Sequence, residues 1–205
     1  MSKIQIYGIP ASRAFRVLWM AHEVGIDYDN IPVAFNDGTN KKPDYLAVNP
    51  NGKVPALKDG DLTLFESLAI DWYLARKYDQ GRGLSPRDAE EEALALQWTL
   101  WAANEVEIPV IHWAVNAYVA PPEKRDAAIA AASWEKLRGP LKVLDHVLAG
   151  HDYLVGDRFT VADLNVAACL YRLLVADLPD YPRVDAWLDR CFERPAALAA
   201  RKLRE

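Results

Sequence analysis

The residues best suited to bind a ligand or take part in a reaction lie between Asn49 and Ser67, in the stretch NPNGKVPALKDGDLTLFES. Pro55 has no backbone N–H for a strand ladder, so its neighbour Val54 is expected at an unpaired backbone edge. Glu66 and Ser67 open an apolar helix, whose first N–H groups have no partner within the helix. A short extended peptide could therefore pair with Val54 and place a carboxylate on those N–H groups.

Ser12 is a second candidate, because it directly precedes the first apolar helix. A serine there either caps the helix or donates a hydrogen bond to a reacting group, and its position alone favours the cap. The two cysteines, Cys169 and Cys191, lie in later helical patterns. Any thiol chemistry must therefore use a thiol brought by a ligand. The four histidines lack metal-ligand spacing, so the sequence predicts no metal site.

The elements that must position these candidates begin with a β-α-β unit. Alternation in IQIY predicts a strand over Lys3–Gly8, and an apolar stripe predicts a helix to about Glu23. Gly25 ends that helix. A second strand over Asp27–Ala34 is expected to run parallel to the first, because a helix joins the two.

A predicted hairpin leads directly into the second long helix of this region. Residues 37–43 form a polar loop, and Asp44–Val48 is a single helical turn. Val54–Leu57 is the first strand of the hairpin, and Asp59-Gly60 predicts a type I′ turn. The helix that opens at Glu66-Ser67 continues to about Tyr78.

Strand signals disappear beyond a break at residues 79–86, where we place a domain boundary. Arg87–Val119 is a long helical pattern with an expected kink at Pro109. Glu123–Ala149 is a second long helix, which Gly139-Pro140 is expected to bend. Two long adjacent helices imply an antiparallel pair.

The sequence FTVADL at residues 159–164 predicts a capping box between Thr160 and Asp163. The helix that follows, Val161 to about Val175, is apolar on nearly all faces and is expected to be buried. Asp163 is therefore interpreted as a structural cap, with a catalytic role as the weaker alternative. Two further helices are expected over Pro182–Cys191 and Pro195–Leu203.

Composition narrows the possible functions. The chain has 205 residues and a net charge of -5, with no basic run, so nucleic acid and anionic membranes are poor candidates as partners. The first residues lack the apolar segment of a signal peptide, and the most apolar later stretch is too short to span a bilayer. A cytoplasmic protein is the default expectation.

The chain resembles the cytosolic glutathione S-transferases through V-P-A-L, E-S and F-T-V-A-D together. Residues 38–78 are especially similar to the serine-type, phi- and theta-like branch and its bacterial relatives. The implied fold is α/β plus all-α, the glutathione S-transferase architecture. An N-terminal thioredoxin-like domain, residues 1–79, would bind glutathione. A C-terminal all-helical domain, residues 87–205, would supply an electrophile pocket and dimer helices.

The resemblance also implies how glutathione would lie. A cis Val54-Pro55 bond would aim the Val54 backbone at the cysteinyl unit. Glu66 would take the ligand's ammonium, and Ser67 its γ-glutamyl carboxylate. The glycyl carboxylate would meet Asn40, Lys41 and Lys53. Many phi-like members have histidine in place of Asn40 and glutamine in place of Lys53.

Ser12 matches the serine that would donate a hydrogen bond to the glutathione thiolate. Lowering a thiol pKa by about 2 units requires about 2.7 kcal/mol. A charge-assisted hydrogen bond supplies roughly 1.5–3 kcal/mol and a helix dipole about 0.3–1 kcal/mol, so no general base is needed. Arg13 and Arg16 could add positive potential, but solvated charges on a helix face are the commoner explanation.

The implied activity is attack of the glutathione thiolate on an apolar electrophile, with reduction of organic hydroperoxides as an added activity. Glutathione is then a co-substrate, and no prosthetic group is implied. The electrophile pocket of the family maps onto Pro10, Ala11, His112, Trp113 and Asn116, although packing is the commoner role for a helical tryptophan.

Two alternatives remain open. A non-catalytic glutathione S-transferase-like binding module would be expected to lose Ser12 or the Glu66-Ser67 pair, and this chain keeps them. A glutathione-dependent isomerase would carry S-S-C-x-x-R, from which A-S-R-A-F-R departs. Thiol exchange would require a cysteine near the start of the first helix, where this chain has none.

The resemblance implies a role in detoxification and a homodimer of C2 symmetry, in which the first domain of each subunit lies against the long helices of the other. The two long helices carry more apolar residues than one bundle core needs, and the alanine-rich run at residues 127–132 permits close helix approach. Some family members insert an aromatic residue from the loop before the V-P strand into the partner. Asn51 occupies that place here, so the interface is expected to rely on polar contacts and helix packing.

Overall fold

A computed structural model describes residues 3–204, which group into two units. The first unit contains the residues up to Ser85 and those from Glu193 onward, and the second runs from Pro86 to Phe192. The sequence analysis assigned all residues from 87 to 205 to one helical domain. In the structure the segment from Glu193 onward groups with the first unit instead.

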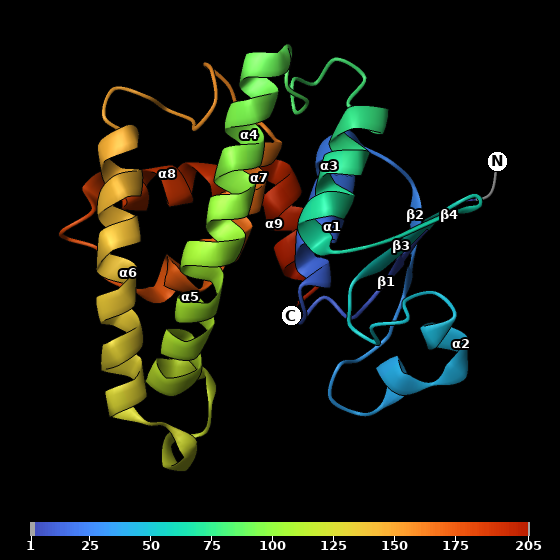
Figure 1. The fold of residues 1–205 in the computed structure, drawn as a ribbon, viewed down its shortest axis with the longest axis horizontal. Helices are drawn as coiled ribbons and strands as arrows, with labels where there is room; N and C mark the ends of the chain where they lie inside the picture. The colour runs from blue at the N-terminus through green and yellow to red at the C-terminus, as the bar shows by residue number, and fades with distance from the viewer. Residues whose placement is uncertain (1–2, 205) are drawn as a thin grey trace. The chain divides into compact units, whose positions relative to one another are not determined.

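A four-stranded mixed sheet forms the centre of the first unit, in the order β2-β1-β3-β4 (Figure 1). β1 runs parallel to β2, as the β-α-β pattern predicted, and β3 is antiparallel to both β1 and β4. The strands are shorter than the sequence suggested: β1 Ile4–Tyr7, β2 Tyr28–Ile31, β3 Ala56–Asp59 and β4 Leu62–Phe65.

The hairpin is present, but its turn differs from the expected type. The register pairs Asp59 with Leu62, so the two central residues are Gly60 and Asp61 rather than Asp59 and Gly60. Gly60 has φ 60°, whereas Asp61 is not among the residues with positive φ. A type I′ turn needs positive φ at both central residues, while a type II′ turn needs it only at the first. The turn is therefore not the type I′ turn expected at Asp59-Gly60, and a positive φ at the first central residue alone is what a type II′ turn requires.

The helices of the first unit cover both faces of the sheet. α1 and α3 pack against each other, and α9 packs against α1. The short α2 lies on the opposite face (Figure 1), where Tyr45 packs beside Val33 and Ala56. The bounds are α1 Ala14–Val24, α2 Pro43–Leu46, α3 Ser67–Tyr78 and α9 Pro195–Lys202, with a 3₁₀ turn over Thr39–Lys41.

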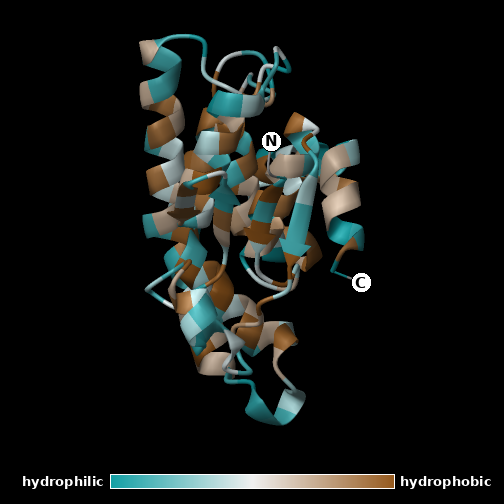
Figure 2. Ribbon diagram, turned by 90° about the vertical axis from the view of Figure 1, so that its right-hand side faces the viewer, coloured by the Kyte–Doolittle hydropathy of each residue, from teal (hydrophilic) through white to brown (hydrophobic). Residues whose placement is uncertain are grey.

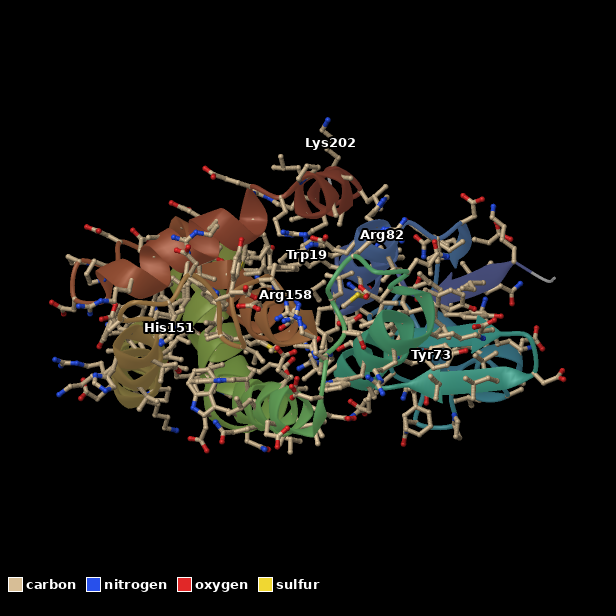
Figure 3. The ribbon with its side chains drawn as sticks, turned by 90° about the horizontal axis from the view of Figure 1, so that it is seen from above. Trp19, Tyr73, Arg82, His151, Arg158 and Lys202 are labelled. Atoms are coloured by element: carbon tan, nitrogen blue, oxygen red, sulfur yellow. The ribbon has the colours of Figure 1, made fainter. Side chains whose placement is uncertain are left out.

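α1 is enclosed almost completely, since His22 is its one residue that is not buried. Burial on all sides forces its polar groups to find partners inside the protein. Glu23 accepts from Trp19 Nε1 at 2.9 Å and from Arg194 Nε and Nη2, both at 2.7 Å. These bonds fasten the start of α9 to the end of α1. Figure 3 shows Trp19 in the interior and Lys202 extending outward from α9.

Asp59, at the end of β3, is held by three side chains of α3. Its Oδ2 accepts from Tyr73 at 2.6 Å, from Lys77 at 2.7 Å and from Tyr78. These bonds, with the hydrogen bond and ion pair to Lys77 most prominent, lower the pKa of Asp59 despite its partial burial. The hairpin is thereby fixed to α3, the helix that it delivers (Tyr73 in Figure 3).

The regular secondary structure of the second unit, residues 86–192, consists of helices joined by loops, with no strand. Pro109 lies in α5, and a π-helical turn over Ala102–Val106 directly precedes this helix. The wider turn changes the hydrogen-bond pattern of the helix near Pro109, which has no N–H to donate. The long helix expected from Glu123 begins only at Ala127, because Asp126 caps it by accepting from Ala128 N and Ile129 N. The bounds are α4 Ala89–Trp101, α5 Glu107–Ala114, a second π-helical turn Val115–Val119, a 3₁₀ turn Pro122–Lys124, α6 Ala127–Val147, α7 Val161–Leu170 and α8 Pro182–Phe192.

α7 is the central helix of this unit, and every one of its residues is buried. Its α-helical part ends at Leu170, and a 3₁₀ segment, Tyr171–Val175, completes the expected span. The capping box is confirmed: Thr160 accepts from Ala162 N, and Asp163 accepts from Thr160 N at 3.0 Å. Apolar and polar colours alternate on other helices in Figure 2, as expected of helices with one covered face.

Asp163 serves as a buried acceptor for several elements of the second unit. It accepts from Leu154 N at 2.9 Å, from Trp187 Nε1 at 3.1 Å and from the Thr160 hydroxyl at 3.1 Å. The carboxyl therefore joins the loop before α7 to α8. This geometry agrees with a structural role for Asp163.

Asp163 gives a testable pH dependence. Burial raises its pKa to about 6, although hydrogen bonds from Leu154, Thr160 and Trp187 favour the ionised form. An unfolded aspartate titrates near pH ~3.9. Between these values the folded chain keeps a proton that the unfolded chain has lost, so the free energy of unfolding should fall as pH rises from about 4 to about 6. Urea denaturation across this range measures the slope.

The variant Asp163→Asn cannot titrate at this position, so its decline should be shallower than that of the parent protein, even if its stability is lower throughout. Burial also raises the pKa of Asp71, and the decline that remains in the variant is assigned to that group. Asp157→Asn, which removes an exposed acid from the same unit, is the matched control and should retain the decline. Glu91 does not interfere, because Arg158 lowers its pKa to about 2 and its contribution is lost only as pH falls through about 4.5 to about 2. Equal slopes in Asp163→Asn and the parent protein would contradict the assignment.

Candidate active site

The site is organised around a close approach at Gly8, the residue that follows β1. Gly8 has φ 136°, a conformation that favours glycine. A Cβ placed there would lie 2.8 Å from Ala14 Cβ, 3.3 Å from Val54 Cβ and 3.5 Å from Ser12 Oγ. Ser12 and Val54 are therefore neighbours across Gly8. Two candidates separated by 42 residues in the sequence meet here because Gly8 has no side chain.

Ser12 is half-buried and makes two hydrogen bonds ahead of α1. Its Oγ accepts from Ala14 N at 3.1 Å and donates to the Ile9 carbonyl at 2.7 Å. The first bond is the local bond expected of a serine before a helix, although Arg13 is the N-cap residue by backbone position. The second bond can be exchanged, because a hydroxyl hydrogen rotates to suit its acceptor.

The Val54-Pro55 peptide bond is cis, as the resemblance implied. The ladder of β3 begins with Ala56, which pairs with Tyr7 and Phe65. Val54 thus lies outside the ladder, at the edge expected from the proline that follows it. An extended ligand could pair with this edge, beside the Ser12 hydroxyl.

Glu66 and Ser67 stand at the start of α3, as predicted. Glu66 is exposed and has φ 72° and ψ 107°, a rare conformation for a residue with a side chain. Ser67 is buried, and its Oγ accepts from Arg16 Nη1 at 3.2 Å. The Ser67 hydroxyl therefore keeps its own hydrogen for another acceptor, at a helix N-terminus that favours anions.

Two charged residues near Ser67 escaped the sequence analysis. For Arg16 the sequence analysis preferred a solvated charge on a helix face over a source of positive potential at the thiolate, but Arg16 is buried, with 6% of its surface exposed. Asp71 was not singled out, and it is buried one turn after Ser67. Their type and spacing in the sequence resemble those of surface charges, so only the enclosure of α1 by other elements could have revealed them.

The three residues assigned to the glycyl carboxylate lie around Gly52. The carbonyl of Gly52 accepts from Asn40 Nδ2 at 2.8 Å and from Lys41 Nζ at 2.9 Å. Asn40 is buried by this contact, whereas Lys41 and Lys53 are exposed. Asn40 and Lys41 therefore shape the loop before Val54, and Lys53 presents its ammonium group at the surface.

The residues assigned to the electrophile pocket belong to both units. In the first unit Ala11 is exposed, and the Pro10 carbonyl accepts from Arg204 Nη1 at 2.8 Å. In the second unit His112 is exposed, and Trp113 packs against Trp134 with 5.3 Å between ring centroids. Asn116 donates to the His112 carbonyl and accepts from Asp126 N. Trp113 and Asn116 thus stabilise the second unit, as packing would predict.

A hollow of about 510 Å³ in the second unit contains none of the predicted site residues. Its lining includes His151, labelled in Figure 3, together with Arg183 and Arg190, which pair with Asp145 and Asp152. Among residues 3–204 no group of three or more His, Cys, Asp or Glu side chains could hold a metal ion. Within the same range, no helix is both long and apolar enough to cross a membrane.

Known proteins resemble the chain over nearly its whole length. Residues 2–76 match the model of the glutathione S-transferase N-terminal domain, and residues 107–195 match that of the C-terminal domain. Glutathione S-transferase 4 of Zea mays is 35% identical over 95% of this chain and 90% of its own length. Glutathione S-transferase F13 of Arabidopsis thaliana is 35% identical over 95% and 93%.

A solved structure agrees with these relatives. The theta class glutathione S-transferase from Xanthomonas axonopodis pv. citri, solved with glutathione bound, is 34% identical, with a TM-score of 0.89. It covers 98% of this chain, which covers 97% of it. Sequence relatives and fold thus agree with each other, and the chain belongs to the glutathione S-transferase family.

Proposed function

We propose that the first unit binds glutathione across the predicted residues and activates its thiol for transfer. The γ-glutamyl carboxylate lies at Ser67, the ammonium at Glu66 and the cysteinyl unit along Val54. Asn40, Lys41 and Lys53 receive the glycyl end, directly or through the loop that they shape. The observation that carries this proposal is the proximity of Ser12 and Val54 at Gly8, because it brings a hydroxyl donor to the edge where the thiol would lie.

Ser12 stabilises the thiolate by changing its hydrogen-bond acceptor. Its O–H turns from the Ile9 carbonyl to the sulfur, while the bond from Ala14 N holds Oγ in place. The thiol proton leaves to solvent, and the thiolate then forms a bond to an electrophilic carbon as the leaving group departs or a double bond opens. A serine-type enzyme of this kind needs no general base, and Arg13, the N-cap residue of α1, adds positive potential.

The electrophile is apolar. Of the residues that the resemblance assigns to its pocket, Pro10 and Ala11 belong to the first unit and His112 to the second. Residues 1–79 provide the glutathione site, and the long helices of the second unit provide the dimer contact and part of the electrophile pocket. Organic hydroperoxides are further substrates, and the protein acts in detoxification in the cytoplasm. Its class is the phi- and theta-like branch with bacterial relatives.

A panel of aryl halides, enals, isothiocyanates and hydroperoxides tests the activity. Turnover of one of these classes is expected, since the chain keeps Ser12 together with Glu66 and Ser67. Glutathione binding without turnover of any class would favour a binding module. Turnover confined to cis-trans isomerisation would favour an isomerase.

Binding itself is tested by calorimetric titration with glutathione. Ser67→Ala and Glu66→Gln should each weaken affinity by about 1–3 kcal/mol, since each removes one partner of a charge-assisted hydrogen bond. Thr63→Ala, a change on exposed β4 of the same unit, is the control and should bind like the parent protein. Absence of heat at millimolar glutathione in the parent protein would refute the site.

Ser12→Ala distinguishes thiolate stabilisation from capping. If Ser12 donates to the sulfur, the variant should show a raised pKa of bound glutathione and reduced turnover, with affinity nearly unchanged. Ultraviolet titration of the bound thiolate measures that pKa. A helix cap alone would instead lower thermal stability, through loss of the acceptor for Ala14 N, and leave the thiol pKa as it was.

We also propose that two copies assemble through the long helices. Several leucines of α4 are exposed, with Leu100 at 59% and Leu96 one turn before it at 42%. A row of exposed leucines on a helix favours a protein partner over water. Asn51 lies exposed in its loop, so the contact depends on these helices rather than on an inserted aromatic ring.

Sedimentation equilibrium at low and high salt measures this assembly. A dimer is expected at micromolar concentration, and Leu100→Glu should shift it toward monomer because it buries a charge in an apolar contact. Leu198→Glu changes an exposed leucine of α9 and should leave the dimer intact. A 23.0 kDa monomer in the parent protein under both conditions would rule out the proposed dimer.

A further inference from the structure

Asp71 is a fully buried carboxyl group that forms no hydrogen bond. It lies in the interior of α3 with no exposed surface, and neither Oδ1 nor Oδ2 has a hydrogen-bond partner among residues 3–204. A buried ionised carboxylate without hydrogen bonds is very unfavourable, so such a group takes up a proton. Burial accordingly raises the pKa of Asp71 well above its usual range, and the charge of Arg16 opposes this only in part.

The position of Asp71 relates it to the carboxylate subsite. Asp71 follows Ser67 by four residues, so both side chains lie on the same face of α3. That face packs on α1, where Arg16 donates to Ser67 Oγ at 3.2 Å. Arg16 thus interacts with Asp71 through its charge and with Ser67 through a hydrogen bond.

The other charged side chains on the elements around α3 either pair with different residues or exert no resolved effect on the Asp71 carboxyl. Glu23 of α1 is bound to Arg194 and Trp19, and Asp59 of β3 is bound to Tyr73, Lys77 and Tyr78. β4 carries no charged residue. The titratable and charged groups on the elements packed against α3 are Arg16, His22 and Glu23 of α1, with Arg13 before it, and Lys58 and Asp59 of β3. Arg16 is the one whose charge acts on the Asp71 carboxyl.

We propose that Asp71 is a positioning residue of the γ-glutamyl subsite, which acts through Arg16 and holds that subsite competent only while its carboxyl is protonated. Neutral Asp71 leaves the guanidinium on the Ser67 oxygen. Ser67 then directs its own hydrogen toward the ligand carboxylate. Ionised Asp71 attracts the guanidinium away from Ser67 and places a second negative charge near the ligand carboxylate.

Linkage makes the effect reciprocal. A ligand carboxylate beside Ser67 favours the protonated form of Asp71, and protonation of Asp71 favours the ligand by the same factor. Glutathione affinity should therefore decline as pH rises through the titration of Asp71. The decline is separate from ionisation of the thiol, which lies at the other end of the site beside Ser12.

The test uses the full-length protein and S-methylglutathione, whose sulfur cannot titrate. Affinity is measured by calorimetry from about pH 5 to about pH 9, a span that lies above the usual titration range of an aspartate. The parent protein should lose about tenfold more affinity across this range than Asp71→Asn, in which the side chain has nearly the same shape but stays neutral. The ligand's own ammonium titrates alike in both proteins and cancels in the comparison.

Asp61→Asn is the matched control, because it removes an exposed acid from the hairpin turn of the same unit. It should follow the parent profile. Asp71→Leu, which also cannot ionise, should behave as Asp71→Asn does and serves if the asparagine variant folds poorly. A carboxyl infrared band that Asp71→Asn lacks should show the protonated acid directly in the parent protein.

The proposal rests on the proposed glutathione site, and the outcomes separate the two. Identical pH profiles for Asp71→Asn and the parent protein, with binding intact, would overturn the role of Asp71 and leave the glutathione site standing. Absence of binding by both proteins at every pH would overturn the site and the role of Asp71 together. A role in stability alone would change unfolding without changing the ratio of affinities across pH.

Discussion

The enclosure of α1 is the constraint on which the first unit depends. The helix contacts β1, α3 and α9, so its polar side chains have almost no access to water. A buried charge must be paired or hydrogen-bonded to persist. Glu23 meets this requirement through Arg194 and Trp19, and Arg16 contacts Ser67. Because the polar side chains of α1 are buried, the elements around it must supply hydrogen-bond and ion-pair partners for them.

The same enclosure creates the chemistry of the site. A helix covered on all sides leaves its N-terminal end as the place where a ligand can approach, and Ser12 lies just before that end. Gly8 lets the chain pass close enough for Val54 to reach the same place. Ser67, at the start of the neighbouring α3, is oriented by the guanidinium of Arg16. Packing and ligand recognition therefore use the same contacts.

Local signals predicted the elements of the site well. The hairpin, α3 with its start at Ser67 and the capping box at Thr160 each depend on residues close together in the sequence, so pattern and propensity sufficed. The turn at Gly60 was misassigned because Asp-Gly fits more than one register. The π-helical turn that accommodates Pro109 had no sequence signal.

Burial and contacts between residues far apart in the sequence could not be predicted from local patterns. Arg16 and Asp71 have the spacing of ordinary helix residues, and their burial follows only from how α1 and α3 pack. The grouping of α9 with the first unit likewise depends on Glu23 and Arg194, which are 171 residues apart. Propensity carries no information about such contacts, because it describes each segment alone.

The attachment of α9 to α1 has a consequence for synthesis on the ribosome. The chain emerges from its N-terminus, so the sheet and α1 appear first, while α9 follows only after all of the second unit. Until then the surface of α1 that α9 will cover stays open, and Glu23 lacks Arg194. The first unit therefore stays incomplete while more than a hundred residues, those of the second unit, are synthesised. During this time a chaperone that binds apolar surfaces could bind the exposed side of α1.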